Sequence, residues 1–192
     1  MAITISIDDW RISNVSVESI TETFYSESIQ GKGNSIGTGQ HRYKIKFSIT
    51  LSTADEVLAF EALMLQIRGQ QNPFYLDLGD ESNWFNPFTI PLSGSILTTV
   101  PASTGNNTIS INNTLLIPVG AKFTQPNDTK VYQVIGKSGS SITIFPSLRF
   151  PLSTGTVLNF RNPQPYLRLN SNAFTLSYER AKEISLTALE VL

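Results

Sequence analysis

Residues 33–37 read Gly-Asn-Ser-Ile-Gly and match G-x-S-x-G, the pattern that places a nucleophilic serine in many hydrolases. That chemistry needs a helix directly after the serine and a histidine further along the chain to act as the base. Residues 42–49 instead alternate polar and apolar side chains, which is typical of a strand. The single histidine, His41, follows closely after Ser35. We therefore expect Ser35 to be a hydrogen-bonding turn residue and not a nucleophile.

The same glycine-rich segment, residues 31–39, also suggests a phosphate-binding loop. A Walker A loop needs Lys and then Ser or Thr after its last glycine, whereas Thr38 and Gly39 follow Gly37. A dinucleotide fingerprint would need its third glycine where the chain has Ile36. The segment is therefore interpreted as a pliable tip between two strands, where glycine tolerates a positive φ.

Asp77, Asp80 and Glu81 form an acidic cluster after an expected strand. Such carboxylates occur in glycosidases and in calcium sites, although a solvated turn at a domain junction explains them more simply. The chain has no cysteine, which excludes disulfides and thiolate sites, and one histidine does not make a usual zinc or iron site. We expect no enzymatic activity, no cofactor and no metal.

The charge balance argues against binding to polyanions. The chain has 14 Lys and Arg and 15 Asp and Glu, which gives a formal net charge of −1. A net positive charge of the kind that attracts nucleic acid or anionic membranes is missing. The sequence also contains no apolar run near the ~20 residues that span a bilayer. We expect no membrane insertion and no nucleic-acid partner.

Two alternating segments, residues 10–30 and 41–51, predict a long antiparallel hairpin. An arm of ten residues spans ~33 Å, which is more than a small core needs. Acidic side chains lie on the first arm and basic side chains on the second, so we expect ion pairs across the strands, each contributing a few tenths of a kcal/mol. These residues are Glu18, Glu22 and Glu27 on the first arm, and Arg42, Lys44 and Lys46 on the second.

One helix is predicted after the hairpin. Thr53 and Glu56 have the spacing of a capping box, and Gly69 marks the end of the helix. Residues 73–78 then read as a strand. The apolar face of the helix consists of Val57, Phe60, Met64 and Ile67.

The second half of the chain lacks any helical pattern. Short strand-like runs bounded by Gly, Pro, Asn and Asp predict a small antiparallel barrel, an OB-like or SH3-like Greek key of five or six strands. Three later runs would complete the sheet begun by the N-terminal third. The barrel runs are residues 94–100, 107–111, 121–125, 130–136, 141–146 and 155–160, and the later runs are 165–170, 173–179 and 183–191.

The predicted fold is mainly β. A discontinuous domain, residues 1–85 plus 164–192, carries the helix and the hairpin, and residues 86–163 form the inserted barrel. An alternative function is that the insert binds saccharide or single-stranded nucleic acid through aromatic and basic side chains. The candidates for that face are Phe123, Tyr132, Lys122, Lys130, Lys137 and Arg149.

Three sequence segments carry a resemblance to a known family. They are "ADEVLAFEALMLQIRGQQNPFYLDLGD" after the hairpin, "GAKFTQPNDTKVYQVIGKSGSSITIFPSLRF" in the insert, with Pro146-Ser147-Leu148-Arg149 near its end, and the terminal "EISLTALEVL". With the long hairpin, they make the chain resemble the distal tail proteins of long-tailed bacteriophages. The resemblance covers most of the chain and favours the short members with a single insert.

The resemblance implies a structural role in the virion. The fold would be a tail-tube-like β-sandwich or barrel with an OB-like insert, and six copies would close into a ring, assembled in the host cytoplasm. The ring would join the tail tube to the hub or tail tip of the baseplate, so the partners would be other copies, the tail-tube protein and hub or tip proteins. We expect the assembly interface on the hairpin, at Glu18, Glu22, Ser35, Arg42, Lys44 and Lys46.

Overall fold

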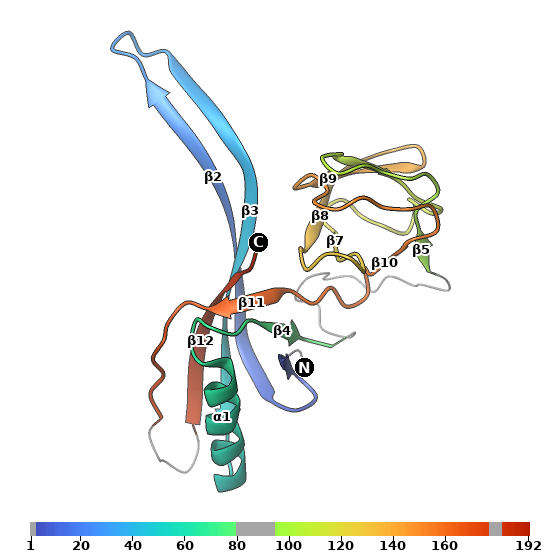
Figure 1. Cartoon of the computed structure of the whole chain (residues 1–192). Helices are drawn as coiled ribbons and strands as arrows, with labels where there is room; N and C mark the ends of the chain where they lie inside the picture. The colour runs from blue at the N-terminus through green and yellow to red at the C-terminus, as the bar shows by residue number, and fades with distance from the viewer. Residues whose placement is uncertain (1–2, 80–94, 177–181) are drawn as a thin grey trace.

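A computed structural model of the chain describes residues 3–79, 95–176 and 182–192 (Figure 1). Within these ranges the chain forms twelve strands and one helix, which confirms the mainly β fold. A long hairpin projects from a sheet that carries the helix, and a small barrel lies to one side of the hairpin. In the described residues, no helix is long and apolar enough to cross a membrane.

The larger sheet has six strands in the order β1-β4-β11-β12-β3-β2. β1 pairs in parallel with β4, and the other neighbours are antiparallel. The N-terminal and C-terminal parts of the chain thus share one sheet, as predicted. The strands are β1 (Ile3–Ser6), β2 (Arg11–Glu27), β3 (Gly33–Leu51), β4 (Phe74–Asp77), β11 (Tyr166–Leu169) and β12 (Lys182–Glu190).

Two details of this sheet differ from the sequence prediction. β1 was not predicted, because an alternating run of 4 residues is too short to distinguish from a loop. The run 173–179 was predicted as a strand, but its described residues, 173–176, are irregular. They lie beside the helix instead of joining the sheet, and Phe174 packs edge-on against Phe60 with ring centroids 6.3 Å apart.

The helix α1 (Ala54–Ile67) has the predicted capping box. The Glu56 backbone N–H donates to Thr53 Oγ1 (3.2 Å), and the Thr53 N–H donates to Glu56 Oε2 (3.3 Å). The helix ends before Gly69, because Arg68 adopts the left-handed conformation (φ 53°) and donates its N–H to Met64 O. Phe60, Met64 and Ile67 are buried as predicted, and Val57 is partly buried against the same core.

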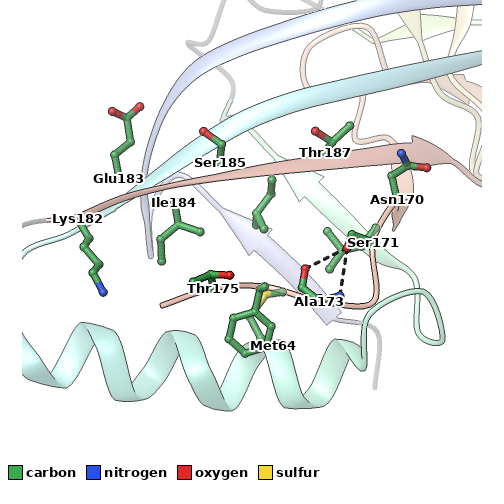
Figure 2. A pocket seen from close by; sticks show the side chains of 13 residues that line it. Met64, Asn170, Ser171, Ala173, Thr175, Lys182, Glu183, Ile184, Ser185 and Thr187 are labelled. Atoms are coloured by element: carbon green, nitrogen blue, oxygen red, sulfur yellow. Dashed lines mark hydrogen bonds between the residues drawn. The ribbon is translucent and has the colours of Figure 1, made fainter. Parts of the chain in front are cut away.

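A groove of about 490 Å³ lies between α1, the segment 169–175 and β12 (Figure 2). Ser171 holds the segment in a tight bend, because its Oγ donates to Ala173 O and accepts from Ala173 N, both at 3.1 Å. The two charged residues of the lining, Lys182 and Glu183, are neighbours in β12 and point to opposite faces of the strand. Lys182 and Glu183, the charged residues among the described lining, are therefore not paired for acid–base chemistry.

The hairpin is confirmed, but its tip overlaps the predicted one only at residues 31 and 32. The turn is formed by residues 28–32, where Ser28 N–H donates to Lys32 O (2.9 Å). Residues 33–37 belong to β3 and pair with residues 23–27 of β2, with Ser35 opposite Tyr25. The predicted glycine-rich tip over residues 31–39 is confirmed at Gly31, which has a positive φ (75°), and at Lys32. It was wrong for residues 33–39, and Ser35 is a strand residue and not a turn residue, because backbone pairing with β2 holds most of this segment extended.

Six short strands form the barrel, and each lies in one of the six predicted runs or starts there. β6-β9-β8-β7 make one antiparallel sheet, and β5 and β10 make a second. Single bridges, Thr98↔Ile111 and Thr124↔Asn159, join the two sheets and close the barrel. The strands are β5 (Ile96–Leu97), β6 (Thr108–Ser110), β7 (Lys122–Phe123), β8 (Tyr132–Ser138), β9 (Ser141–Phe145) and β10 (Val157–Leu158).

The barrel has Greek-key connectivity, because β10 returns to lie beside β7 after the β7-β8-β9 meander. Its core is a separate cluster of buried residues between Ile96 and Phe160, whereas Val131 packs into the core beneath the large sheet. A mainly β fold with a barrel is thus confirmed. The closer likeness to an OB fold stays a prediction, as do the domain limits near residues 85 and 164.

Candidate assembly interface

Every residue from 21 to 40 is exposed, and we call this part of the hairpin the distal ribbon. Four large apolar side chains lie on it: Phe24, Tyr25, Ile29 and Ile36. Phe24 (70% exposed) lies directly opposite Ile36 (64% exposed) in the strand pairing. A two-stranded hairpin is marginally stable alone in water, and clustered exposed apolar side chains mark interaction sites. The distal ribbon is therefore a candidate contact surface.

β2 adds a second feature to this surface. It is the last strand of the large sheet, and among the described residues no strand pairs with its outer edge over 17 residues. The opposite edge of the sheet is the much shorter β1. An open edge presents unpaired N–H and C=O groups that another strand can bind. The chain thus exposes a long edge on one side of its sheet and a short edge on the other.

One predicted ion pair across the hairpin is present. Glu18 lies opposite Lys44, and Lys44 Nζ is 2.9 Å from Glu18 Oε2. Both side chains are well exposed to solvent, so the pair helps the strand register more than it stabilises the fold.

The other predicted pairs are out of register within the described strands. Two irregularities, between Ser13 and Ser16 and between Thr21 and Thr23, shift the pairing along β2. Glu22 falls inside the second irregularity, where its backbone O accepts a hydrogen bond from Thr38 Oγ1 (2.9 Å). The opposite residues are Ile20 for Arg42, Ser16 for Lys46 and Gly33 for Glu27. Residues 16–21 pair with residues 41–46 in one continuous register, and in that register Glu18 is the acidic residue that lies opposite a basic one. The alternating pattern does not fix the register of two strands, which is why the other pairs were not predicted correctly.

Ser35 and His41 do not form a catalytic pair. Ser35 lies in the distal ribbon, whereas His41 is buried and its Nε2 is 2.8 Å from Ser19 Oγ. Lys130 Nζ lies 3.3 Å from His41 Nδ1 and donates to it, so the ring proton is on Nε2 and is donated to Ser19. In this tautomer His41 cannot remove a proton from Ser19. Burial, and then the Lys130 charge, lower the pKa of His41 to about 4, so the ring is neutral at pH 7.

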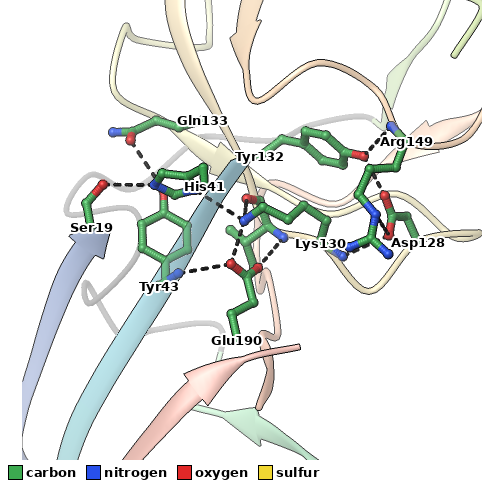
Figure 3. Close-up of polar contacts among 10 residues, drawn as sticks. Ser19, His41, Tyr43, Asp128, Lys130, Tyr132, Gln133, Arg149 and Glu190 are labelled. Atoms are coloured by element: carbon green, nitrogen blue, oxygen red, sulfur yellow. Dashed lines mark hydrogen bonds and ion pairs between the residues drawn. The ribbon is translucent and has the colours of Figure 1, made fainter. Parts of the chain in front are cut away.

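A buried ion pair joins the barrel to the large sheet (Figure 3). Lys130 precedes β8 of the barrel and is 0% exposed, and Glu190 ends β12 and is 1% exposed. Lys130 Nζ donates to Glu190 Oε2 (2.5 Å) and to Val131 O (3.0 Å). Burial lowers the pKa of Lys130, and the Glu190 carboxylate counteracts part of that shift. We call this pair and the groups bonded to it the junction.

β3 completes the junction from the hairpin side. Glu190 accepts hydrogen bonds from the backbone N–H groups of Val131 (2.9 Å) and Tyr43 (3.1 Å). Lys130 Nζ lies 4.9 Å from the centroid of the Tyr43 ring, a cation–π distance. Tyr43 OH also donates to Gln133 Oε1 in β8 (3.3 Å). The junction therefore ties the barrel to the part of the hairpin just below the distal ribbon.

Asp77 forms a second attachment at the base of the barrel. Its Oδ1 accepts from the Gly79 N–H (2.9 Å) and from Asn162 Nδ2 (2.8 Å), and its Oδ2 accepts from Gln164 Nε2 (2.6 Å). The carboxylate thus ties the chain leaving the sheet to the chain returning from the barrel. Asp80 and Glu81 lie outside the described residues, and the described part holds no group of three or more acidic or histidine side chains suited to a metal ion.

The residues proposed for a nucleic-acid face do not form one. Phe123 and Tyr132 are buried in the barrel core and stack on each other, with ring centroids 5.5 Å apart. Lys130 is in the junction, and Arg149 Nε lies 3.7 Å from Asp128 Oδ1. Bases bind by stacking on exposed rings, which these residues do not offer. Binding of saccharide by the insert stays a prediction.

The sequence reasoning missed the junction, although β12 carries a signal for it. Ile184, Leu186 and Ala188 face the core, and the alternation puts the charged Glu190 on the same face. A carboxylate in that position needs a buried partner. Neither the search of protein-family models nor the search of curated proteins found a match to this chain.

Proposed function

We propose that this chain is a structural component of a bacteriophage tail, which closes into a ring through its hairpin and joins the tail tube to the tail tip or hub. The observation that carries the proposal is the distal ribbon, residues 21–40, which is exposed throughout and displays Phe24, Tyr25, Ile29 and Ile36. These side chains are unfavourable in water and are explained by a partner that covers them.

The sheet edges support the same proposal. A head-to-tail contact between copies would bring the open edge of β2 beside a different surface of the next copy, and repetition of that contact around an axis closes a ring. Closure would cover the open edge that is a liability in a free chain. The resemblance to distal tail proteins suggests six copies, with the tail-tube protein and hub or tip proteins as neighbours and the barrel on the outside.

The test compares assembly of the parent chain and a double variant, Phe24→Ser with Ile36→Ser. Each protein is produced with its tail-tube protein, and assemblies are examined by light scattering and electron microscopy. We expect rings from the parent and none from the variant, with equal circular dichroism for both. Leu58→Ser is the matched control, because Leu58 is 63% exposed but lies on α1. Rings from the double variant, or a parent that never assembles, would refute the proposal.

A further inference from the structure

The junction connects two bodies that each have a hydrophobic core. The barrel core is built from buried residues between Ile96 and Phe160. The core beneath the large sheet comes from the N-terminal and C-terminal parts of the chain, with Val131 as the member from the insert. Lys130 and Val131 lie just before β8 and reach from the barrel to the sheet. If the barrel separates from the large sheet at the junction, the buried residues of the barrel core therefore stay packed together.

Charge carries much of this contact. Both side chains of the Lys130–Glu190 pair are fully buried, so each has lost its hydration. In such a pair the desolvation penalty largely cancels the attraction, whereas loss of one partner leaves a charge buried without compensation. Moving the barrel away from the sheet would return both groups to water. The Lys130–Glu190 pair thus fixes the orientation of the barrel relative to the large sheet, while its net contribution to the stability of the docked arrangement is small.

The Asp77 attachment is placed where a hinge would be needed. It lies where the chain leaves β4 for the barrel and where it returns toward β11, and it binds both passages through Gly79, Asn162 and Gln164. Its carboxylate contacts neither Lys130 nor Glu190 in the hydrogen bonds that these groups form. The base of the barrel can therefore stay attached when the junction opens.

We propose that Lys130 and Glu190 form a latch that holds the barrel against β3 and β12, and that the barrel swings away as a folded body when the pair is broken. A partner with a charged group that competes for Lys130 or Glu190 would open the latch without unfolding the barrel. This inference concerns the single chain and does not depend on ring formation.

The test measures the distance between the barrel and the helix. The chain has no cysteine, so Ala62→Cys on α1 and Thr104→Cys in the barrel introduce two exposed sites for spin labels. Glu190→Gln removes the buried carboxylate charge at nearly constant size. We expect one narrow distance distribution for the parent and a broad, displaced one for Glu190→Gln. Glu18→Gln, which removes the charge of the exposed pair with Lys44, is the matched control and should leave the distribution unchanged.

Hydrogen exchange of β8 and β9 shows whether the displaced barrel is still folded. The latch requires that these strands stay protected in Glu190→Gln. It is overturned if the distance distribution matches that of Glu18→Gln, or if protection of β8 and β9 is lost together with the orientation. If Glu190→Gln does not give folded protein, Glu190→Asp is judged by the same two criteria. That variant keeps the charge but is one methylene too short to reach both Lys130 and the Val131 N–H.

Discussion

The distal ribbon and the junction both involve β3, and they differ in which kind of side chain they expose and which kind they bury. The ribbon displays Phe24 and Ile36 to solvent, whereas the junction buries Lys130 and Glu190 completely. At the junction both charged groups have hydrogen-bond partners within the chain. The apolar side chains of the ribbon are instead exposed to solvent. The junction is thus complete within one chain, whereas the exposure of the ribbon is what supports the proposal that a second chain covers it.

The largest expected effect comes from removing one charge of the junction. In Glu190→Ala the Lys130 ammonium has no counter-charge as long as the barrel stays docked, which costs the docked chain about 3–5 kcal/mol. We expect the free energy of unfolding to fall by up to this amount, because opening of the junction returns Lys130 to water. Urea denaturation followed by circular dichroism measures the change. Phe24→Ser, in the distal ribbon, should change the stability of the free chain by no more than about 0.5 kcal/mol. Similar losses for the two variants would remove the contrast between the regions.

Asp77→Ala should have a smaller effect. It leaves Asn162 Nδ2, Gln164 Nε2 and the Gly79 N–H without their acceptor at a partly buried site, which costs about 1–3 kcal/mol. The same denaturation experiment measures it. Asp77→Asn is the control, because its amide oxygen still accepts hydrogen bonds and should recover part of the loss. If Asp77→Ala is as stable as the parent, the Asp77 attachment does not contribute to the stability of the fold.

The pH dependence should reflect His41, which faces the junction. Its pKa falls from 6.5 to about 4 in the folded chain, so the unfolded chain binds the proton at a higher pH than the folded chain does. This contribution to stability is therefore fully present above about pH 6.5 and is lost as the pH falls from 6.5 toward 4.

The variant His41→Gln isolates that contribution. Glutamine does not titrate, yet its amide can accept from Lys130 and donate to Ser19 as the histidine does. Thermal unfolding between pH 4 and pH 7 should show a shallower loss of stability for His41→Gln than for the parent. If the melting temperature depends on pH equally in both proteins, protonation of His41 does not contribute to the loss of stability at low pH.

Charge reversal at Lys44 and Lys46 should have the smallest effect on the fold. Lys44 forms an exposed pair with Glu18, and such pairs contribute about 0.2–1 kcal/mol. We expect Lys44→Glu with Lys46→Glu to leave the melting temperature nearly unchanged and to disrupt ring assembly, as seen by electron microscopy. Normal rings from this variant would restrict the interface to the apolar part of the hairpin.

Local patterns predicted most of the fold because each depends on neighbouring residues. The capping box at Thr53 and the six barrel runs are of this kind. The pairing along the hairpin was harder, because the register of its two strands and the irregularities near Ser13 and Thr21 do not follow from the alternation of polar and apolar residues. The junction depends on residues as far apart as Tyr43, Lys130 and Glu190, so only the carboxylate of Glu190 on the apolar face of β12 indicated it.

Hydrogen exchange over residues 21–40 tests the central claim, that the distal ribbon is completed by another chain, most directly. In the free chain the amides of the ribbon should exchange rapidly, because an isolated hairpin opens easily. In assembled tails the same amides should become strongly protected, while protection in β8 and β9 stays as it is in the free chain. Rapid exchange of residues 21–40 in assembled tails would contradict the account.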